Sequence, residues 1–218
     1  MKLIVLLLTT ATLLAITSPS GIAYPTSCCS IPTADILDAG AIRLELQNSG
    51  FAGTESSGAT SDRLIELGLT PRLEVGFDQC DITGHGENSL NMKYLMSPES
   101  KSLPALAVGV MDISRGERPS YYGISTRTFG RSRVHAGYIH GDYAKGGMLG
   151  CDYALTKRTY LLADWMNGSE NYSTVGIYQG IGKNANLLLA YGFPNEKGAD
   201  QLLAINLNYI FKFSTGKR

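Results

Sequence analysis

The sequence lacks a second long apolar run. The stretch "LIVLLLTTATLLAI", 14 residues long, follows Lys2, and the small-X-small site Gly21-Ile22-Ala23 comes shortly after it. This order is typical of a secretory signal peptide, and the run is short for an N-terminal membrane anchor, which needs roughly 20 residues. We therefore expect residues 1–23 to be a signal peptide cut after Ala23, and no transmembrane helix beyond it.

The sequence also lacks an excess of either charge and a cysteine framework. It has 19 basic and 19 acidic residues, and removal of Lys2 leaves 18 and 19, a net charge of −1. That balance gives no reason to expect a nucleic-acid partner. The four cysteines, two of them the vicinal Cys28 and Cys29, match neither a disulfide framework nor a metal-binding spacing. We predict no cofactor and no metal, and leave lipidation of Cys28 open.

Catalytic motifs are missing as well. His135 and His140 lie in "RVHAGYIHGDY", but there is neither a serine motif like that of the phospholipase barrels nor the Asp-X-His order of outer-membrane proteases. His85 stands in a loop as "GHG", which alone is no metal site. We therefore predict that the chain is not an enzyme, and we interpret His135 as one more polar side chain inside the fold.

The sequence does have a hydrophobic period of two. In residues 201–213, Leu203, Ile205 and Leu207 share one face, while Asn206 and Asn208 share the other. Alternation over more than ten residues exceeds the five or six residues of a typical soluble strand. Twelve such segments can be placed, at about 40–50, 60–69, 71–80, 87–97, 103–113, 119–129, 132–142, 145–155, 158–167, 171–181, 185–194 and 201–213.

The connections between these segments alternate in length. "LTPR" (69–72) and "LTKR" (155–158) are tight, whereas the connections near 53–59 and 194–200 are longer and polar. This layout is typical of an outer-membrane barrel, which must close because unpaired backbone groups are costly in hydrocarbon. We predict an all-β fold, an antiparallel up-and-down transmembrane β-barrel of about 12 strands, with short turns in the periplasm. It divides into an irregular N-terminal segment (24–38), the barrel (39–213) and a C-terminal tail (214–218).

The polar face of the alternating segments should line the lumen. It contains six basic groups, six acidic groups and one histidine: Arg43, Glu45, Glu66, Arg72, Glu74, Asp78, Lys93, Arg127, Arg133, His135, Asp152, Asp164 and Lys212. Buried charges need partners, so a balanced set predicts ion pairs across a narrow interior. We favour pairs that fill the barrel over a selective conduit.

Several stretches resemble the YjbH-like family of bacterial outer-membrane barrels. They are "TADILDAGAIRLEL", "LTPRLEVGFD", "LNMKYLMSPES" with "LPALAVGVMDIS", and "YALTKRTYLLADW". The resemblance runs from about Thr33 to the C-terminus and rests on turns and strand starts. It implies a barrel associated with exopolysaccharide production and supplies no catalytic residue.

These observations lead to one main functional hypothesis and two alternatives. We expect an outer-membrane β-barrel with a structural or envelope role that supports exopolysaccharide export or anchoring. The alternatives are a passive or gated pore for small solutes and a secreted soluble β-barrel binding protein. The expected partners are outer-membrane lipid and a polysaccharide or an export component, with no nucleic acid, and the expected location is the bacterial outer membrane.

Overall fold

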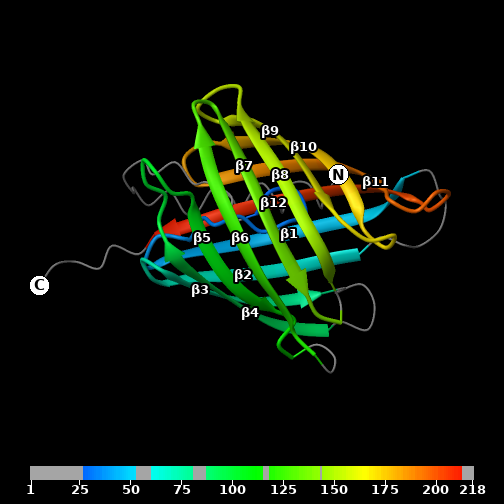
Figure 1. The fold of residues 1–218 in the computed structure, drawn as a ribbon, viewed down its shortest axis with the longest axis horizontal. Helices are drawn as coiled ribbons and strands as arrows, with labels where there is room; N and C mark the ends of the chain where they lie inside the picture. The colour runs from blue at the N-terminus through cyan, green and yellow to red at the C-terminus, as the bar shows by residue number, and fades with distance from the viewer. Residues whose placement is uncertain (1–26, 53–59, 81–86, 115–117, 143, 213–218) are drawn as a thin grey trace, which may run out of the picture.

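The computed structural model describes residues 27–52, 60–80, 87–114, 118–142 and 144–212 (Figure 1). The predicted signal peptide and the C-terminal tail at 214–218 lie outside these residues, as does His85. The strands are β1 Ala41–Ala52, β2 Thr60–Thr70, β3 Leu73–Cys80, β4 Glu87–Ser97, β5 Ala105–Met111, β6 Ser120–Phe129, β7 Ser132–His140, β8 Lys145–Ala154, β9 Thr159–Met166, β10 Tyr172–Ile181, β11 Ala185–Pro194 and β12 Gln201–Lys212.

The twelve strands form one closed antiparallel barrel, which confirms the predicted fold class. Each strand pairs with its neighbours in sequence, and β1 closes the ring against β12, from Ala41 opposite Lys212 to Ala52 opposite Gln201. Figure 1 shows the first and last strands, in blue and red, side by side. Closure gives every strand a hydrogen-bonding partner on both sides. The described residues contain no helix long and apolar enough to cross a membrane.

The outside of the barrel is apolar. In β12, Leu203, Ile205 and Leu207 are exposed, whereas Asn206 and Asn208 are buried inside. The alternation follows from the pleat, which sends successive side chains to opposite faces of a strand. The polar face predicted from this strand, with Asn206 and Asn208, is therefore the face that the closed ring encloses.

Exposed aromatic side chains gather near both ends of the strands. Tyr121, Tyr138, Trp165 and Phe193 lie next to the longer loops. At the opposite end, next to the short turns, Tyr94, Phe129 and Tyr153 are exposed. Tyr121 and Phe129 are eight residues apart on β6, so the two groups are separated by about 20 Å if the strand is tilted by roughly 40°.

The repeated Leu-Thr-X-Arg units form turns at the same end of the barrel. Thr70 Oγ1 accepts a hydrogen bond from the Arg72 N–H at 3.1 Å, and Thr156 Oγ1 accepts one from the Arg158 N–H at 3.1 Å. A threonine hydroxyl that binds the backbone two residues on is a local turn signal. The repeat therefore marks two of the connections that launch new strands from the short-turn end.

Candidate functional site

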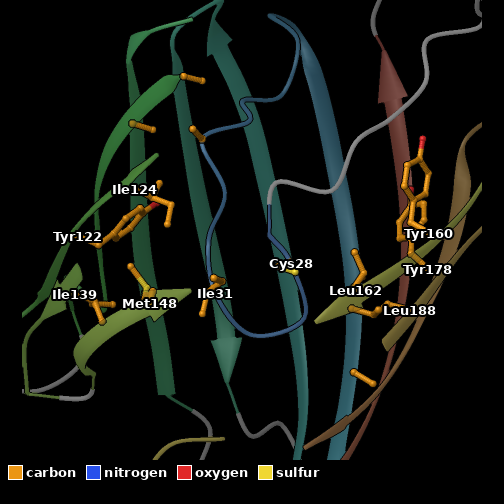
Figure 2. Close-up of a cluster of buried hydrophobic side chains, with 14 residues drawn as sticks. Cys28, Ile31, Tyr122, Ile124, Ile139, Met148, Tyr160, Leu162, Tyr178 and Leu188 are labelled. Atoms are coloured by element: carbon orange, nitrogen blue, oxygen red, sulfur yellow. The ribbon is translucent and has the colours of Figure 1, made fainter. Parts of the chain in front are cut away.

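Residues 27–40, which we call the plug, run through the interior of the barrel and reach its rim at Asp38 and Ala39, which are exposed. Figure 2 shows Cys28 and Ile31 inside the ring of strands, with Met148 to one side and Leu162 to the other. Cys28 and Ile31 are fully buried, and Leu37 nearly so. Apart from one bridge between Ser27 and Pro32, the plug forms no strand. Of the irregular N-terminal segment expected at 24–38, the described residues 27–38 thus belong to the plug.

Two glycines of the barrel wall make room for the plug. A Cβ added at Gly150 in β8 would lie 2.8 Å from the Ile31 Cδ1, and one added at Gly176 in β10 would lie 2.8 Å from the Cys29 Sγ. Real Cβ atoms do not approach other heavy atoms so closely. The wall is therefore recessed where the plug passes.

Asp164 of β9 binds the first half of the plug. The Asp164 Oδ2 accepts hydrogen bonds from the backbone N–H of Ser30 at 2.8 Å and of Ile31 at 3.3 Å. Its Oδ1 accepts one from the Ser30 hydroxyl at 2.7 Å and another from Thr174. An irregular buried segment must satisfy its backbone donors with side chains, and this carboxylate does so here.

A buried chain of hydrogen-bonded side chains holds the middle of the plug. The Ala34 N–H donates to the Thr126 Oγ1 at 3.0 Å, Thr126 Oγ1 lies 2.9 Å from the His135 Nδ1, and His135 Nε2 lies 3.1 Å from the Asp152 Oδ2. With a ring hydrogen on Nε2, the Thr126 hydroxyl can donate to Nδ1 while accepting from Ala34. His135 is fully buried, and this chain of groups links the plug backbone at Ala34 to Asp152 of the wall.

Ion pairs hold the second half of the plug. Arg133 of β7 lies 2.8 Å from the carboxylates of both Asp35, in the plug, and Asp152, in β8. The Leu37 N–H donates to the Glu74 Oε2 at 2.8 Å, and Glu74 pairs with Lys93 at 3.3 Å. The polar groups of the wall thus form hydrogen bonds and ion pairs with the plug as well as with one another.

Most of the predicted lumenal residues lie inside the barrel. They are Arg43, Glu45, Glu66, Glu74, Asp78, Lys93, Arg133, His135, Asp152 and Asp164. Thr126, Thr174 and the plug's own Ser30 and Asp35 were not predicted, although they carry many of the contacts. For Thr126 and Thr174 the one signal in the sequence is that alternation places them on the same face as neighbouring interior residues of β6 and β10. Ser30 and Asp35 have no such signal.

Three predicted lumenal residues lie elsewhere. Arg72 is exposed in the turn between β2 and β3, since the strand begins one residue later. Arg127 has the outward phase of β6, because Thr126 takes the interior position, and its guanidinium donates to the backbone carbonyls of Ser100, Lys101 and Leu103. Lys212 is half exposed at the rim, 2.7 Å from Asp38.

These corrections change the expected charge balance. Without Arg72, Arg127 and Lys212, the predicted set keeps three basic groups and all six acidic groups. Asp35 of the plug adds one more carboxylate. The interior is therefore acidic. The equal balance of charge expected from the sequence is wrong, whereas ion pairs inside the barrel are present at Arg43, Lys93 and Arg133.

Two cavities lie on opposite sides of the plug. One of about 300 Å³ extends toward the longer loops and is lined by residues of β1–β6 and β10–β12 and by plug residues that include Ile31 and Pro32. The other, of about 420 Å³, lies at the short-turn end and is lined by Pro71, Pro98 and Gly130 together with Asp35. The plug therefore stands between a cavity on the loop side and a cavity on the turn side.

Among the described residues, one group has a geometry that could hold a metal ion. Ligand atoms of Cys28, Cys29 and Asp164 lie within 4.8 Å of one another. Both Asp164 oxygens already accept hydrogen bonds from Ser30, Ile31 and Thr174. We therefore interpret this group as part of the plug's attachment.

One comparison with solved structures supports the fold. No family model and no curated protein sequence matches this chain. Among solved structures, a KdgM porin superposes with a TM-score of 0.56 and 14% identity, over 78% of this chain and 99% of that chain. The fold is that of a porin-like barrel.

Two further structures superpose less well on this porin-like barrel. Outer-membrane phospholipase A from Escherichia coli, solved as an active-site mutant, has a TM-score of 0.45 and 8% identity, over 86% of this chain and 95% of that chain. The N-terminal barrel domain of Pseudomonas aeruginosa OprF has a TM-score of 0.29 and 12% identity, over 80% and 100%. Neither adds to the argument, and the absence of enzymatic activity stays a prediction.

Proposed function

We propose that this chain is an outer-membrane pore for small solutes that its own plug closes. Membrane insertion is supported by the exposed apolar side chains of the outer face and by the two groups of aromatic residues near the strand ends. Both features are typical of transmembrane barrels. A secreted soluble barrel would turn its polar face outward, so we do not favour that alternative.

The plug is the observation that carries the proposal. It lies between two cavities that together reach from the loop side to the turn side of the barrel. Its contacts are hydrogen bonds and ion pairs to side chains of the wall, whereas the wall closes through backbone pairing of its own strands. Local segments can open without global unfolding, so displacement of the plug would open a path through an intact barrel.

Conductance in planar bilayers tests this proposal. The full chain should conduct poorly, and Gly150→Leu should raise single-channel conductance, because the added side chain occupies the place of Ile31. Gly147→Leu is the matched control on the same strand, since a Cβ there meets nothing within 4 Å. Large, steady conductance of the unsubstituted chain, or equal conductance of the two variants, would contradict a plugged pore.

Membrane location has a separate test. An inserted barrel sediments with the outer-membrane fraction, and its gel mobility changes on boiling because the closed ring resists detergent until it is heated. The chain should show both properties. Recovery in a soluble periplasmic or culture fraction would instead favour the secreted binding protein.

The second candidate is support of exopolysaccharide export or anchoring, which the YjbH-like resemblance implies. The observation that favours it is local: the resembling stretch "TADILDAGAIRLEL" forms the second half of the plug and the start of β1. In this proposal the barrel anchors a polysaccharide or an export component. The test is exopolysaccharide yield in a strain that lacks this chain. An unchanged yield would remove this candidate and leave the pore.

A further inference from the structure

The cavity on the loop side has an unusual wall. Four carboxylates, two basic groups and parts of the plug line its volume of about 300 Å³. The carboxylates are Glu45, Glu66, Glu74 and Asp78, and the basic groups are Arg43 and Lys93. The wall therefore carries two more acidic than basic side chains. A volume of this size is at the lower end of the range of about 300–1,000 Å³ for small-ligand sites.

Both basic groups are engaged with carboxylates of this wall. The Arg43 guanidinium lies 2.6 Å from Glu66 and 3.6 Å from Glu45. The Lys93 Nζ lies 3.3 Å from Glu74, whose other oxygen accepts the Leu37 N–H. Glu45 and Glu66 share the single Arg43 guanidinium, and Asp78 is the one carboxylate of this wall with no ion pair to Arg43 or Lys93.

Asp78 has a neutral partner. Its Oδ2 accepts a hydrogen bond from the Asn91 Nδ2, and its Oδ1 is buried with no hydrogen-bond partner among the described residues. A buried carboxylate oxygen without a donor is costly. The wall of the cavity therefore holds a buried, unpaired acceptor, and a positively charged donor would be its natural partner.

Asn206 adds an independent sign of a ligand. Its side chain is 6% exposed, and its Nδ2 donates to the Glu45 Oε1 at 2.8 Å. Its Oδ1 is buried with no partner among the described residues, although Asn206 belongs to the cavity wall. Two residues with unpaired acceptors, Asp78 on β3 and Asn206 on β12, thus belong to a single cavity wall, together with Arg43, whose Nε is an unpaired donor.

We propose that this cavity binds a small organic cation with ammonium groups at its ends. Such a ligand supplies positive charge and several N–H donors, which are what the Asp78 and Asn206 oxygens lack. An inorganic metal ion fits less well, because among the described residues no group of ligand atoms close enough for a metal includes these carboxylates. The idea that such cations are the solutes of the pore rests on the proposed function. Binding of a cation in the cavity does not depend on it.

Equilibrium binding to the folded full-length barrel in detergent micelles tests the site without any conductance measurement. Calorimetry at low salt compares 1,4-diaminobutane, butylammonium and butanol, which share a four-carbon chain and carry two, one and no positive charges. We expect affinity to fall in that order. Equal binding of the three probes, tighter binding of the dianion glutarate, or displacement of the diamine by equimolar Mg²⁺ would overturn the proposal.

Asp78→Asn tests the assigned residue. It should weaken diamine binding about tenfold or more, the effect of losing one charge-assisted hydrogen bond. Asp200→Asn removes the same charge from an exposed loop position and should leave the affinity unchanged. Heat-modifiable gel mobility checks that both variants are folded. Equal affinities of the two folded variants would exclude Asp78 as the ligand group, and the probe series above holds for the unsubstituted chain if a variant fails to fold.

Discussion

At the scale of single residues, Asp164 joins the wall to the plug. Its two oxygens accept hydrogen bonds from two backbone amides and one hydroxyl of the plug, and from Thr174 of β10. It belongs to a strand that is complete without the plug. Its removal should therefore loosen the plug selectively.

We predict faster hydrogen exchange at the amides of Ser30 and Ile31 in Asp164→Ala. Each buried donor that loses its acceptor costs about 1–3 kcal/mol, so protection there should fall by about one to two orders of magnitude. Exchange of β1 amides paired with β12 should not change. Asp200→Ala, in an exposed loop, is the control. Uniform loss of protection over the whole barrel would contradict a selective role.

Arg127 shows why the sequence predicted some interior residues wrongly. In β6, Tyr121 and Phe129 have the outward phase and Tyr122 and Ile124 the inward phase, so apolar residues occupy both faces. Alternation alone could not decide which face of β6 is the inner one, and Arg127 was predicted to be inside because it is charged. The guanidinium instead binds backbone carbonyls of the turn between β4 and β5. A charged side chain near a strand end can pair with a neighbouring turn, which alternation alone does not reveal.

At the scale of strands, β12 has two faces in different surroundings. Leu207 is exposed on the outer face, whereas Ala204 belongs to the wall of the acidic cavity. Asn208 also faces inward, but it borders a cavity of only about 10 Å³ beside Arg43. A long cation therefore has room at Ala204 and little at Asn208.

We predict that Leu207→Arg destabilises the inserted barrel and that Ala204→Arg does not. A cation on the lipid face near the bilayer midplane costs about 2–4 kcal/mol, while a cation at Ala204 meets carboxylates. Folding into lipid vesicles, followed by the gel shift between boiled and unboiled samples, measures the difference. Equal folding yields of the two variants would refute the assignment of the outer face to lipid.

The plug could not be predicted as an internal element. The strands could be predicted because their signal is local alternation, and closure followed from the cost of unpaired strand edges in hydrocarbon. The plug has no period, and its contacts join residues far apart in sequence, such as Ser30 with Asp164, 134 positions on. Gly150 and Gly176, which make room for it, look like ordinary glycines of a β-rich chain.

At the scale of the whole molecule, the alternation of loops predicts a fixed orientation in the membrane. Lys197 lies exposed in the loop between β11 and β12, and Lys157 lies exposed in the turn between β8 and β9, at the opposite end. After replacement of the four native cysteines by serine, Lys197→Cys should react with a membrane-impermeant thiol reagent on whole cells. Lys157→Cys should react only after the outer membrane is permeabilised. The reverse pattern would invert the barrel.

The seam between β1 and β12 has a consequence for the order of assembly. Ala41 pairs with Lys212 across nearly the whole chain, and such distant pairings form late because of their loop-closure entropy. The plug immediately precedes β1, and its attachment groups lie on β3, β6, β7, β9 and β10, away from the seam, apart from the pair of Asp38 with Lys212 at the rim. We therefore expect the N-terminal residues to settle into a curved, still open sheet, which then wraps around them. Asp164→Ala should then slow the appearance of the heat-modifiable form during refolding. An unchanged time course would mean that the barrel closes first and that the plug enters it afterwards.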